Sequence, residues 1–232
     1  MERASTVLPV LPYDSGADPD DPNSVFELLS LGASDGLAGA LLTIVDIRGG
    51  APRALGAQMA VLSDGRYCGY VSGGCVEAAV ASEAIRAIAT GRDETLRFGT
   101  GSRFIDIELP CGGSIDVHVH VRPDPAMVTE ALRLLAARAP FALALQPQVS
   151  SARLIPGSGA RERSEWRDGA FYRHYHPLTR LVLIGEGHEL IALSNLARSA
   201  GLPVLGYMTA EVGAPHVERV IGVFDRVVQQ GR

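Results

Sequence analysis

Cysteine is scarce in this sequence of 232 residues. The three cysteines, Cys68, Cys75 and Cys111, stand seven and then thirty-six residues apart. Small disulfide-stabilised domains carry even sets of cysteines, and zinc sites use short paired spacings, so the sequence fits neither class. A few unpaired cysteines are typical of a reducing compartment, and we expect a cytoplasmic protein.

Long apolar runs and concentrated positive charge are missing as well. No run approaches the roughly 20 apolar residues of a membrane-spanning helix, and the first residues lack the basic and apolar regions of a secretory signal. The formal net charge is -5 without a basic cluster, which argues against nucleic acid as a partner. The hydrophobic content of 47% and charged content of 20% are those of a globular protein.

The order of apolar periods predicts an α/β protein in four parts. Residues 1–22 are rich in proline and aspartate and show no period, so we expect a flexible arm. Residues 23–145 alternate between helix and strand patterns and are interpreted as one α/β domain. Residues 146–178 are polar and are interpreted as a linker, and residues 179–232 begin with a β-α-β pattern of the Rossmann type.

Turn and capping residues set the bounds of the elements in the second part. Asn23 or Ser24 is expected to cap a first helix that ends near Gly32. Gly91 is expected to end a second helix, which follows Cys75. A third helix is predicted over residues 127–139, and strands over residues 40–47, 58–62, 66–71, 95–98, 115–121 and 141–145.

The stretch SGGCVE, Ser72 to Glu77, places a cysteine behind two glycines at the predicted start of a helix. The unpaired N–H groups and partial positive charge of a helix N-terminus stabilise a thiolate. Gly73 and Gly74 would let a ligand approach the open backbone N–H groups closely. A tight turn followed by a small buried cysteine is the alternative, and these residues alone do not decide between the two.

A second thiol, Cys111, precedes Gly112 and Gly113 just ahead of a predicted strand. If both cysteine-glycine loops lie at one sheet edge, they converge on one cleft. The loop RGGAPR adds Arg48 and Arg53, whose guanidinium groups suit phosphate; a solvated loop is the alternative for both. Such a pocket suits a phosphate-bearing ligand with a soft centre.

The histidines and Cys68 are interpreted as structural. His118 and His120 lie on one face of a predicted strand, a spacing that metal sites use, but the polar face of an edge strand is favoured. His174 and His176 fall in the expected linker and are interpreted as solvated. Cys68 lies inside a hairpin strand, and we expect it in the core.

The run IGEGHEL resembles the start of a dinucleotide-binding unit. Leu190 stands where that motif has a small residue, Glu186 would face a pyrophosphate, and residues 207–210 hold no acid for a ribose. The run therefore favours a Rossmann-like fold and disfavours binding of NAD or NADP.

Three stretches in order, RGGAPRALGAQMAVLSDGRYCGYVSGGCVEAAV, ELPCGGSIDVHV and RLVLIGEGHELIALSNLARSAG, resemble the XdhC/CoxI family of molybdenum-hydroxylase accessory proteins. The resemblance runs from about residue 24 to residue 210. It implies an N-terminal mixed-sheet XdhC-like domain followed by a partial Rossmann-like β-α-β unit. It also implies a non-catalytic maturation chaperone that binds molybdenum cofactor, of the molybdopterin type, as cargo. A xanthine-dehydrogenase-like or CO-dehydrogenase-like molybdenum hydroxylase would receive that cargo.

The resemblance also assigns roles to residues. Cys75 falls in the family's SGGCVE motif and becomes a candidate anchor for molybdenum or its sulfur. Cys111 matches the cysteine of the LPCGG motif, and Arg53 matches the arginine of the APR loop. The expected cofactor-binding set is Cys75, Gly73, Gly74, Cys111, Gly112, Gly113 and Arg53, and no catalytic residue is assigned.

The implied partners are the client enzyme and a cysteine desulfurase. A homo-oligomer is expected because an incomplete C-terminal sheet leaves an edge that a second subunit could cover. Two other functions stay open: a dinucleotide-dependent oxidoreductase using the C-terminal unit, and a dimeric structural protein without a ligand.

Overall fold

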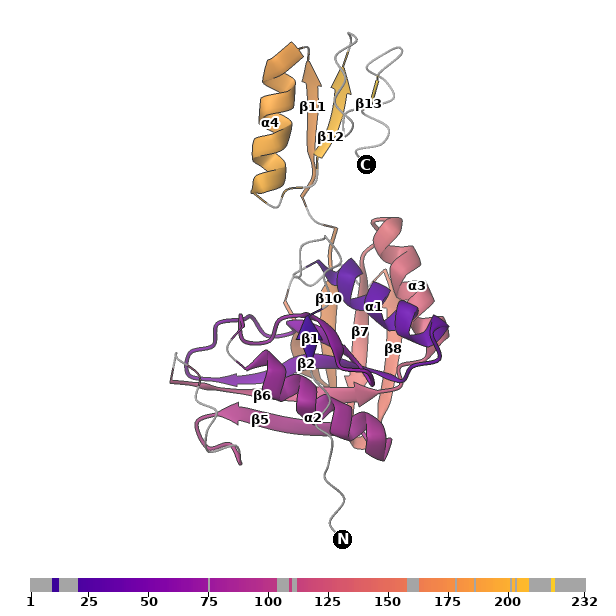
Figure 1. Ribbon diagram of the computed structural model, residues 1–232, viewed down its shortest axis with the longest axis vertical. Coiled ribbons are helices and arrows are strands. Elements are labelled where there is room, and N and C mark those ends of the chain that lie inside the picture. Colours follow the sequence, from indigo (N-terminus) through magenta and orange to yellow (C-terminus); the bar gives the residue numbers. More distant parts are fainter. Residues whose placement is uncertain are drawn as a thin grey trace. The chain divides into compact units, whose positions relative to one another are not determined.

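The computed structural model describes residues 10–12, 21–74, 76–103, 109, 112–157, 163–177, 179–185, 187–200, 202, 204–208 and 218–219. The chain divides into two compact units, residues 1–177 and 178–232. Most of their elements are labelled in Figure 1. The expected arm, residues 1–22, lies mostly outside the described residues.

A mixed six-stranded sheet forms the centre of the first unit, as the α/β prediction required. The strands lie in the order β1 (Leu11–Pro12), β4 (Arg66–Gly69), β3 (Gln58–Leu62), β2 (Gly39–Arg48), β6 (Ser114–Val121) and β5 (Glu94–Gly99). β1 pairs with β4 in parallel, and the other neighbours are antiparallel. The Asp64-Gly65 turn joins β3 to β4, so the hairpin prediction is confirmed.

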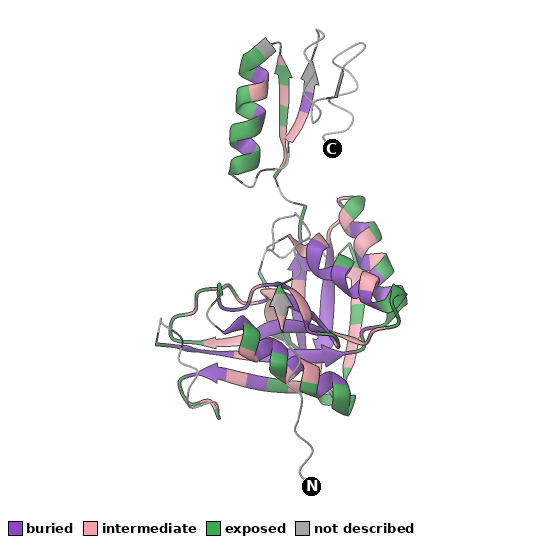
Figure 2. Ribbon diagram, in the orientation of Figure 1, coloured by how far each residue is buried: buried purple, intermediate pink, exposed green. Residues whose placement is uncertain are grey.

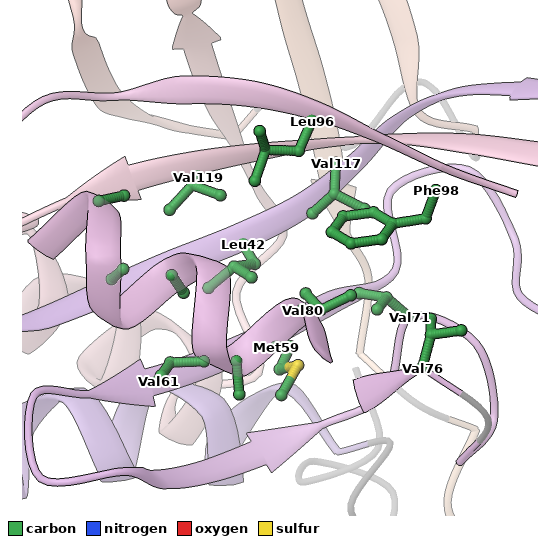
Figure 3. Packing of buried hydrophobic residues seen from close by; sticks show 14 of the residues in the cluster. Leu42, Met59, Val61, Val71, Val76, Val80, Leu96, Phe98, Val117 and Val119 are labelled. Atoms are coloured by element: carbon green, nitrogen blue, oxygen red, sulfur yellow. The ribbon is translucent and has the colours of Figure 1, made fainter. Parts of the chain in front are cut away.

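Helix α2 (Glu77–Thr90) covers one face of this sheet. In Figure 3, Leu42 and Val117 of the sheet point toward α2, where Val80 points back. Gly91 ends the helix in the left-handed conformation, with φ 67°, as expected. Because the facing residues are fully buried, this contact is a main part of the core.

Helices α1 (Pro22–Ser34) and α3 (Pro125–Ala136) contribute to a second apolar cluster, which buries the other face of the sheet. The cap of α1 is Asp21, whose side chain accepts the N–H of Asn23; the prediction of Asn23 or Ser24 was wrong. Pro22 explains the difference, because its fixed φ suits the first helical position and its missing N–H needs no partner there.

A second, four-stranded sheet completes this unit. Its order is β8 (Ser151–Pro156), β7 (Phe141–Gln146), β10 (Ala170–Tyr175) and β9 (Glu165–Arg167), and the short 3-10 helix η1 (Pro147–Val149) follows β7. The interpretation of residues 146–178 as a linker was therefore wrong. β10 pairs with β7, and its residues Phe171 and Tyr175 are buried in the cluster that contains α1 and α3. In Figure 2, buried residues follow one another along the strands of both sheets.

The second unit is a parallel β-α-β arrangement, as predicted. Strand β11 (Leu181–Gly185) leads into helix α4 (Gly187–Ser199), and the chain continues through β12 (Val204–Met208) and β13 (Glu218–Arg219). On α4, Leu190, Ser194 and Ala197 are buried. Among the described helices, none is long and apolar enough to span a bilayer.

Candidate functional site

Three connections leave the six-stranded sheet at the same edge, called here the loop edge. β2, β4 and β5 end there and β3 and β6 begin there, because β4, β3, β2, β6 and β5 are antiparallel neighbours. The described residues 49–57, 70–74 and 112–113 therefore adjoin strand ends at this edge. They include parts of the RGGAPR, SGGC and PCGG stretches, although Cys75 and Cys111 lie outside the described residues. The described glycines of both cysteine-glycine loops thus lie at one edge of the sheet, as the sequence-based hypothesis of a shared cleft requires.

Gly113 forms a direct contact between two of these loops. A Cβ on Gly113 would lie 2.0 Å from the carbonyl oxygen of Gly50 and 2.6 Å from that of Arg48. Any side chain would therefore displace the RGGAPR backbone. Gly112 is exposed, has φ +71°, and would meet nothing within 4 Å. Of the two glycines, Gly113 holds the loops together and Gly112 is open to a ligand.

The SGGC turn is organised by Glu77, a residue whose structural role the sequence did not reveal. Its carboxylate accepts hydrogen bonds of 2.7–3.3 Å from the backbone N–H groups of Val71, Ser72, Gly73, Gly74 and Val76. The Ser72 hydroxyl donates another, at 2.6 Å. The amides of Gly73 and Gly74 are therefore taken by the chain itself, and the expectation that they are open to a ligand was wrong.

The charge on Glu77 is stabilised although the side chain is buried. Burial alone raises the pKa of a carboxyl group, but the hydrogen bonds from Ser72 and from backbone N–H groups outweigh it and hold the pKa of Glu77 below its ordinary value. This anion also occupies the positive end of α2. A thiolate at Cys75 would consequently gain less from the helix than the sequence suggested.

Arg48 and Arg53 have different surroundings, although both belong to the RGGAPR loop. Arg48 pairs with Asp46 at 3.1 Å and with Asp116 at 3.7 Å, so its charge is matched within the chain. Arg53 lines a cleft of about 630 Å³ together with Arg163 and Arg173. We call this the arginine cleft.

The arginine cleft is lined by residues 52–57 on one side and, on the other, by Arg173 of β10 and the two residues that precede β9. The other residues that line it are Pro52, Ala54, Leu55, Gly56, Ala57 and Ser164, and no acid is among these described residues. The Trp166 indole donates to the Val45 carbonyl at 2.7 Å, and the Tyr175 hydroxyl donates to Gln58, which fixes the second sheet beside the loop edge. Arg163 and Arg173 were missed because they fall in the segment interpreted as a linker.

The histidine interpretations need correction. β6 lies between β2 and β5 rather than at an edge, and His118 and His120 are buried beside Asp93. Burial lowers the pKa of His118 to about 4. His174 is also buried, in β10, not solvated. Asp93 gave no signal in the sequence, because its place beside His120 depends on the pairing of β5 with β6.

Cys68 and the glycine loop of the second unit agree with their structural interpretations. Cys68 is a buried free thiol, and burial raises its pKa. Leu190 is buried on α4, and a Cβ on Gly185 would lie 4.0 Å from its Cδ1. A large side chain thus fills the position next to β11 where the dinucleotide motif has a small one. Glu186 lies outside the described residues.

Comparison with known proteins identifies a family, a sequence relative and solved structures of similar fold. Residues 33–99, which contain Arg53 and the SGGC turn, match the model of the XdhC and CoxI family. The molybdenum cofactor insertion chaperone PaoD of Escherichia coli strain K12 is 40% identical over 182 residues, or 78% of this chain and 56% of that protein. The chain thus spans little more than half the length of this relative.

A structural relative supports the fold. A crystal structure described as a xanthine dehydrogenase from Bacillus halodurans superposes with a TM-score of 0.61 at 21% identity, covering 79% of this chain and 61% of that one. At this identity the likeness bears on the fold alone.

Proposed function

We propose, because the chain belongs to the XdhC and CoxI family, that it is an accessory chaperone that binds molybdenum cofactor and delivers it to a molybdenum enzyme. The client would be a xanthine-dehydrogenase-like or CO-dehydrogenase-like hydroxylase. The relative at 40% identity is a molybdenum cofactor insertion chaperone, which is the main support from comparison. The proposed role is carriage and protection, with no covalent step catalysed by the chain.

The observation that carries the proposal is the arginine cleft beside the cysteine-glycine loops. Molybdopterin joins a phosphate to a soft metal-sulfur centre, so its carrier needs an anion site and a thiolate site near each other. Arg53, Arg163 and Arg173 supply guanidinium groups, which bind phosphate with two parallel hydrogen bonds. The proposed anchors for the soft end are Cys75 and Cys111, on the two neighbouring loops.

The glycines have separate proposed roles. Gly73, Gly74 and Gly112 are exposed, so a flat pterin ring can lie against their backbone without meeting a side chain. Gly113 would act indirectly, by holding the RGGAPR loop against the PCGG loop. Glu77 would act by fixing the turn that carries Cys75.

The remaining partners are proposals of the same kind. A cysteine desulfurase would supply the sulfur that the cofactor of such hydroxylases carries. A second copy of the chain could cover apolar side chains of the C-terminal unit, among which Ile184 and Leu196 are 50% and 67% exposed. The cytoplasm is the proposed location for these exchanges.

A transfer assay tests the proposed function. The full chain, loaded anaerobically with molybdenum cofactor, is mixed with the cofactor-free form of a xanthine-dehydrogenase-like enzyme, and the activity gained is compared with that from free cofactor. We expect faster and more complete activation with the chain, and Arg53→Ala should reduce it at least about tenfold. Arg133→Ala is the matched control, since Arg133 lies on α3 and pairs with Glu130. Activation no better than from free cofactor would contradict the proposal.

A further inference from the structure

Two histidines and an aspartate gather at the end of the six-stranded sheet opposite the loop edge. His118 and His120 lie on one face of β6, and Asp93 lies in the connection between α2 and β5. The exposed fractions of their side chains are 1%, 10% and 3%. Because all three reach one small buried volume, their nitrogen and oxygen atoms come within 4.8 Å of one another.

The carboxylate of Asp93 lies between the two imidazole rings. Its Oδ2 is 2.7 Å from Nδ1 of His120 and 3.8 Å from Nε2 of His118. Its Oδ1 accepts the N–H of Val121 at 2.9 Å, which fixes the orientation of the carboxylate. This is the kind of outer contact that holds metal-binding carboxylates in place.

His118 has one partnered nitrogen and one unpartnered nitrogen. Nδ1 lies 3.1 Å from the hydroxyl of Thr95, across the β5–β6 pair. Nε2 is buried without a hydrogen-bond partner and faces the Asp93 carboxylate from beyond hydrogen-bond reach. A buried polar atom without a partner costs free energy, and here its natural complement is a cation placed between the nitrogen and the carboxylate.

We propose that Asp93, His118 and His120 bind a divalent first-row transition metal ion, with Zn²⁺ as the best match to two imidazoles and one carboxylate. Nitrogen and oxygen ligands bind Zn²⁺ at about 2.0–2.1 Å in a tetrahedron, so adjacent ligand atoms lie about 3.4 Å apart. The contact of Asp93 with His118 is near that value, and the contact with His120 would open by less than about 1 Å.

Access and a fourth ligand are available at Asp93. This residue lines a cleft of about 580 Å³ with Arg86, Thr90, Arg92, Glu94 and Arg103. Arg86 and Arg103 pair with Glu83, so much of their charge is matched. Water from this cleft supplies the fourth ligand. Because the site lies at the other end of the sheet from the cysteine-glycine loops, it is separate from the proposed cofactor site.

Zinc titration of the full chain tests the proposal. After removal of metals with a chelator, calorimetry with Zn²⁺ should show an ion at this site in each chain. His118→Asn keeps a group near the Nδ1 position but loses Nε2, and His120→Asn replaces the imidazole Nδ1, which faces Asp93, by a neutral amide group that binds Zn²⁺ poorly. Each variant should weaken binding at least about 100-fold. Thr95→Val removes the outer contact and should weaken it about tenfold. His188→Asn, at an exposed position on α4, is the matched control and should change nothing.

Cobalt spectroscopy distinguishes metal binding at this site from metal binding by the cysteines. It uses the wild-type chain and so does not depend on how the variants fold. Co²⁺ bound to the wild-type chain should show tetrahedral absorption without a sulfur-to-metal charge-transfer band. Three results would each overturn the proposal. They are a sulfur-to-metal charge-transfer band for the bound Co²⁺, no binding of Zn²⁺ by the wild-type chain, and folded Asn variants that bind Zn²⁺ as tightly as wild type does. The last result would leave Asp93 and His120 as a hydrogen bond between a loop and a strand.

Discussion

Glu77 is the residue on which the SGGC turn most depends. Its carboxylate accepts hydrogen bonds from several backbone N–H groups, of which those of Val71 and Ser72 are buried. Glu77→Gln keeps the shape but replaces one acceptor oxygen by an NH₂ group, so donors face donors. We expect the variant to lose about 3 kcal/mol of unfolding free energy, measured by urea denaturation. Glu130→Gln, which removes an exposed carboxylate on α3, should have little effect.

The pH dependence of this difference follows from the lowered pKa of Glu77. A carboxyl group whose pKa is lower in the folded state stabilises the fold above its unfolded value, here about 4.5. That stabilisation is lost as the pH falls through the folded-state pKa. The gap between wild type and Glu77→Gln should therefore be full at neutral pH and narrow below about pH 4.5. A gap that stays constant with pH, or no gap at pH 7, would contradict this role.

Cys68 and Cys75 should differ in thiol reactivity and in the effect of substitution by serine. Cys68 is buried with a raised pKa, so it should resist alkylation in the native state. Cys75 is expected to be the most reactive thiol, read by peptide mass spectrometry. Cys68→Ser should cost about 1–2 kcal/mol by burying a hydroxyl group, and Cys75→Ser should keep the fold and lose most bound cofactor. Equal cofactor retention by Cys75→Ser and wild type would refute the anchoring role.

At the scale of single residues, the sequence predicted where turns form but not which groups their atoms contact. The glycines before Cys75 predicted a turn at a helix start, and that turn is present. The acceptor of hydrogen bonds from its N–H groups could not be predicted, because the Glu77 side chain bends back onto residues that precede it. The placement of His118 and His120 on one face of a strand was correct, but the polar surroundings expected for that face were wrong, because the elements that cover it depend on distant pairing.

Among the elements, β10 most changes the interpretation of the chain. Phe171 is fully buried between strands and helices, in a segment that the sequence assigned to a linker. Phe171→Ala should therefore cost about 3–5 kcal/mol in unfolding free energy. Val149→Ala, at an exposed position in the short 3-10 helix, is the control and should cost little. Equal stability of the two variants would mean that residues 165–175 pack weakly.

Local signals predicted most elements, and long-range pairing decided the rest. Gly91 and the Asp64-Gly65 turn act through their own backbone, so their positions could be predicted. β10 carries Arg173 and His174 among its aromatic residues, and this mixed composition is typical of a polar segment. Its burial comes from pairing with β7, about 30 residues earlier, which no local period reports.

For the whole molecule, the sharpest functional alternative is dinucleotide chemistry on the C-terminal unit. Leu190 is buried next to β11 where close approach of helix and strand needs a small residue. We expect calorimetric titration to show no micromolar affinity for NAD or NADP. Leu190→Ala tests the stated reason, since a gain of affinity in that variant would identify Leu190 as the obstacle. Micromolar binding by wild type would restore the oxidoreductase hypothesis.

Native mass spectrometry of the full chain, purified anaerobically from cells that make molybdenum cofactor, tests the central claim most directly. The account predicts a bound mass that matches a molybdopterin-type cofactor and that is lost on Arg53→Ala or Cys75→Ser while the protein stays folded. A chain that carries no pterin under these conditions, or that carries a dinucleotide in its place, would contradict it.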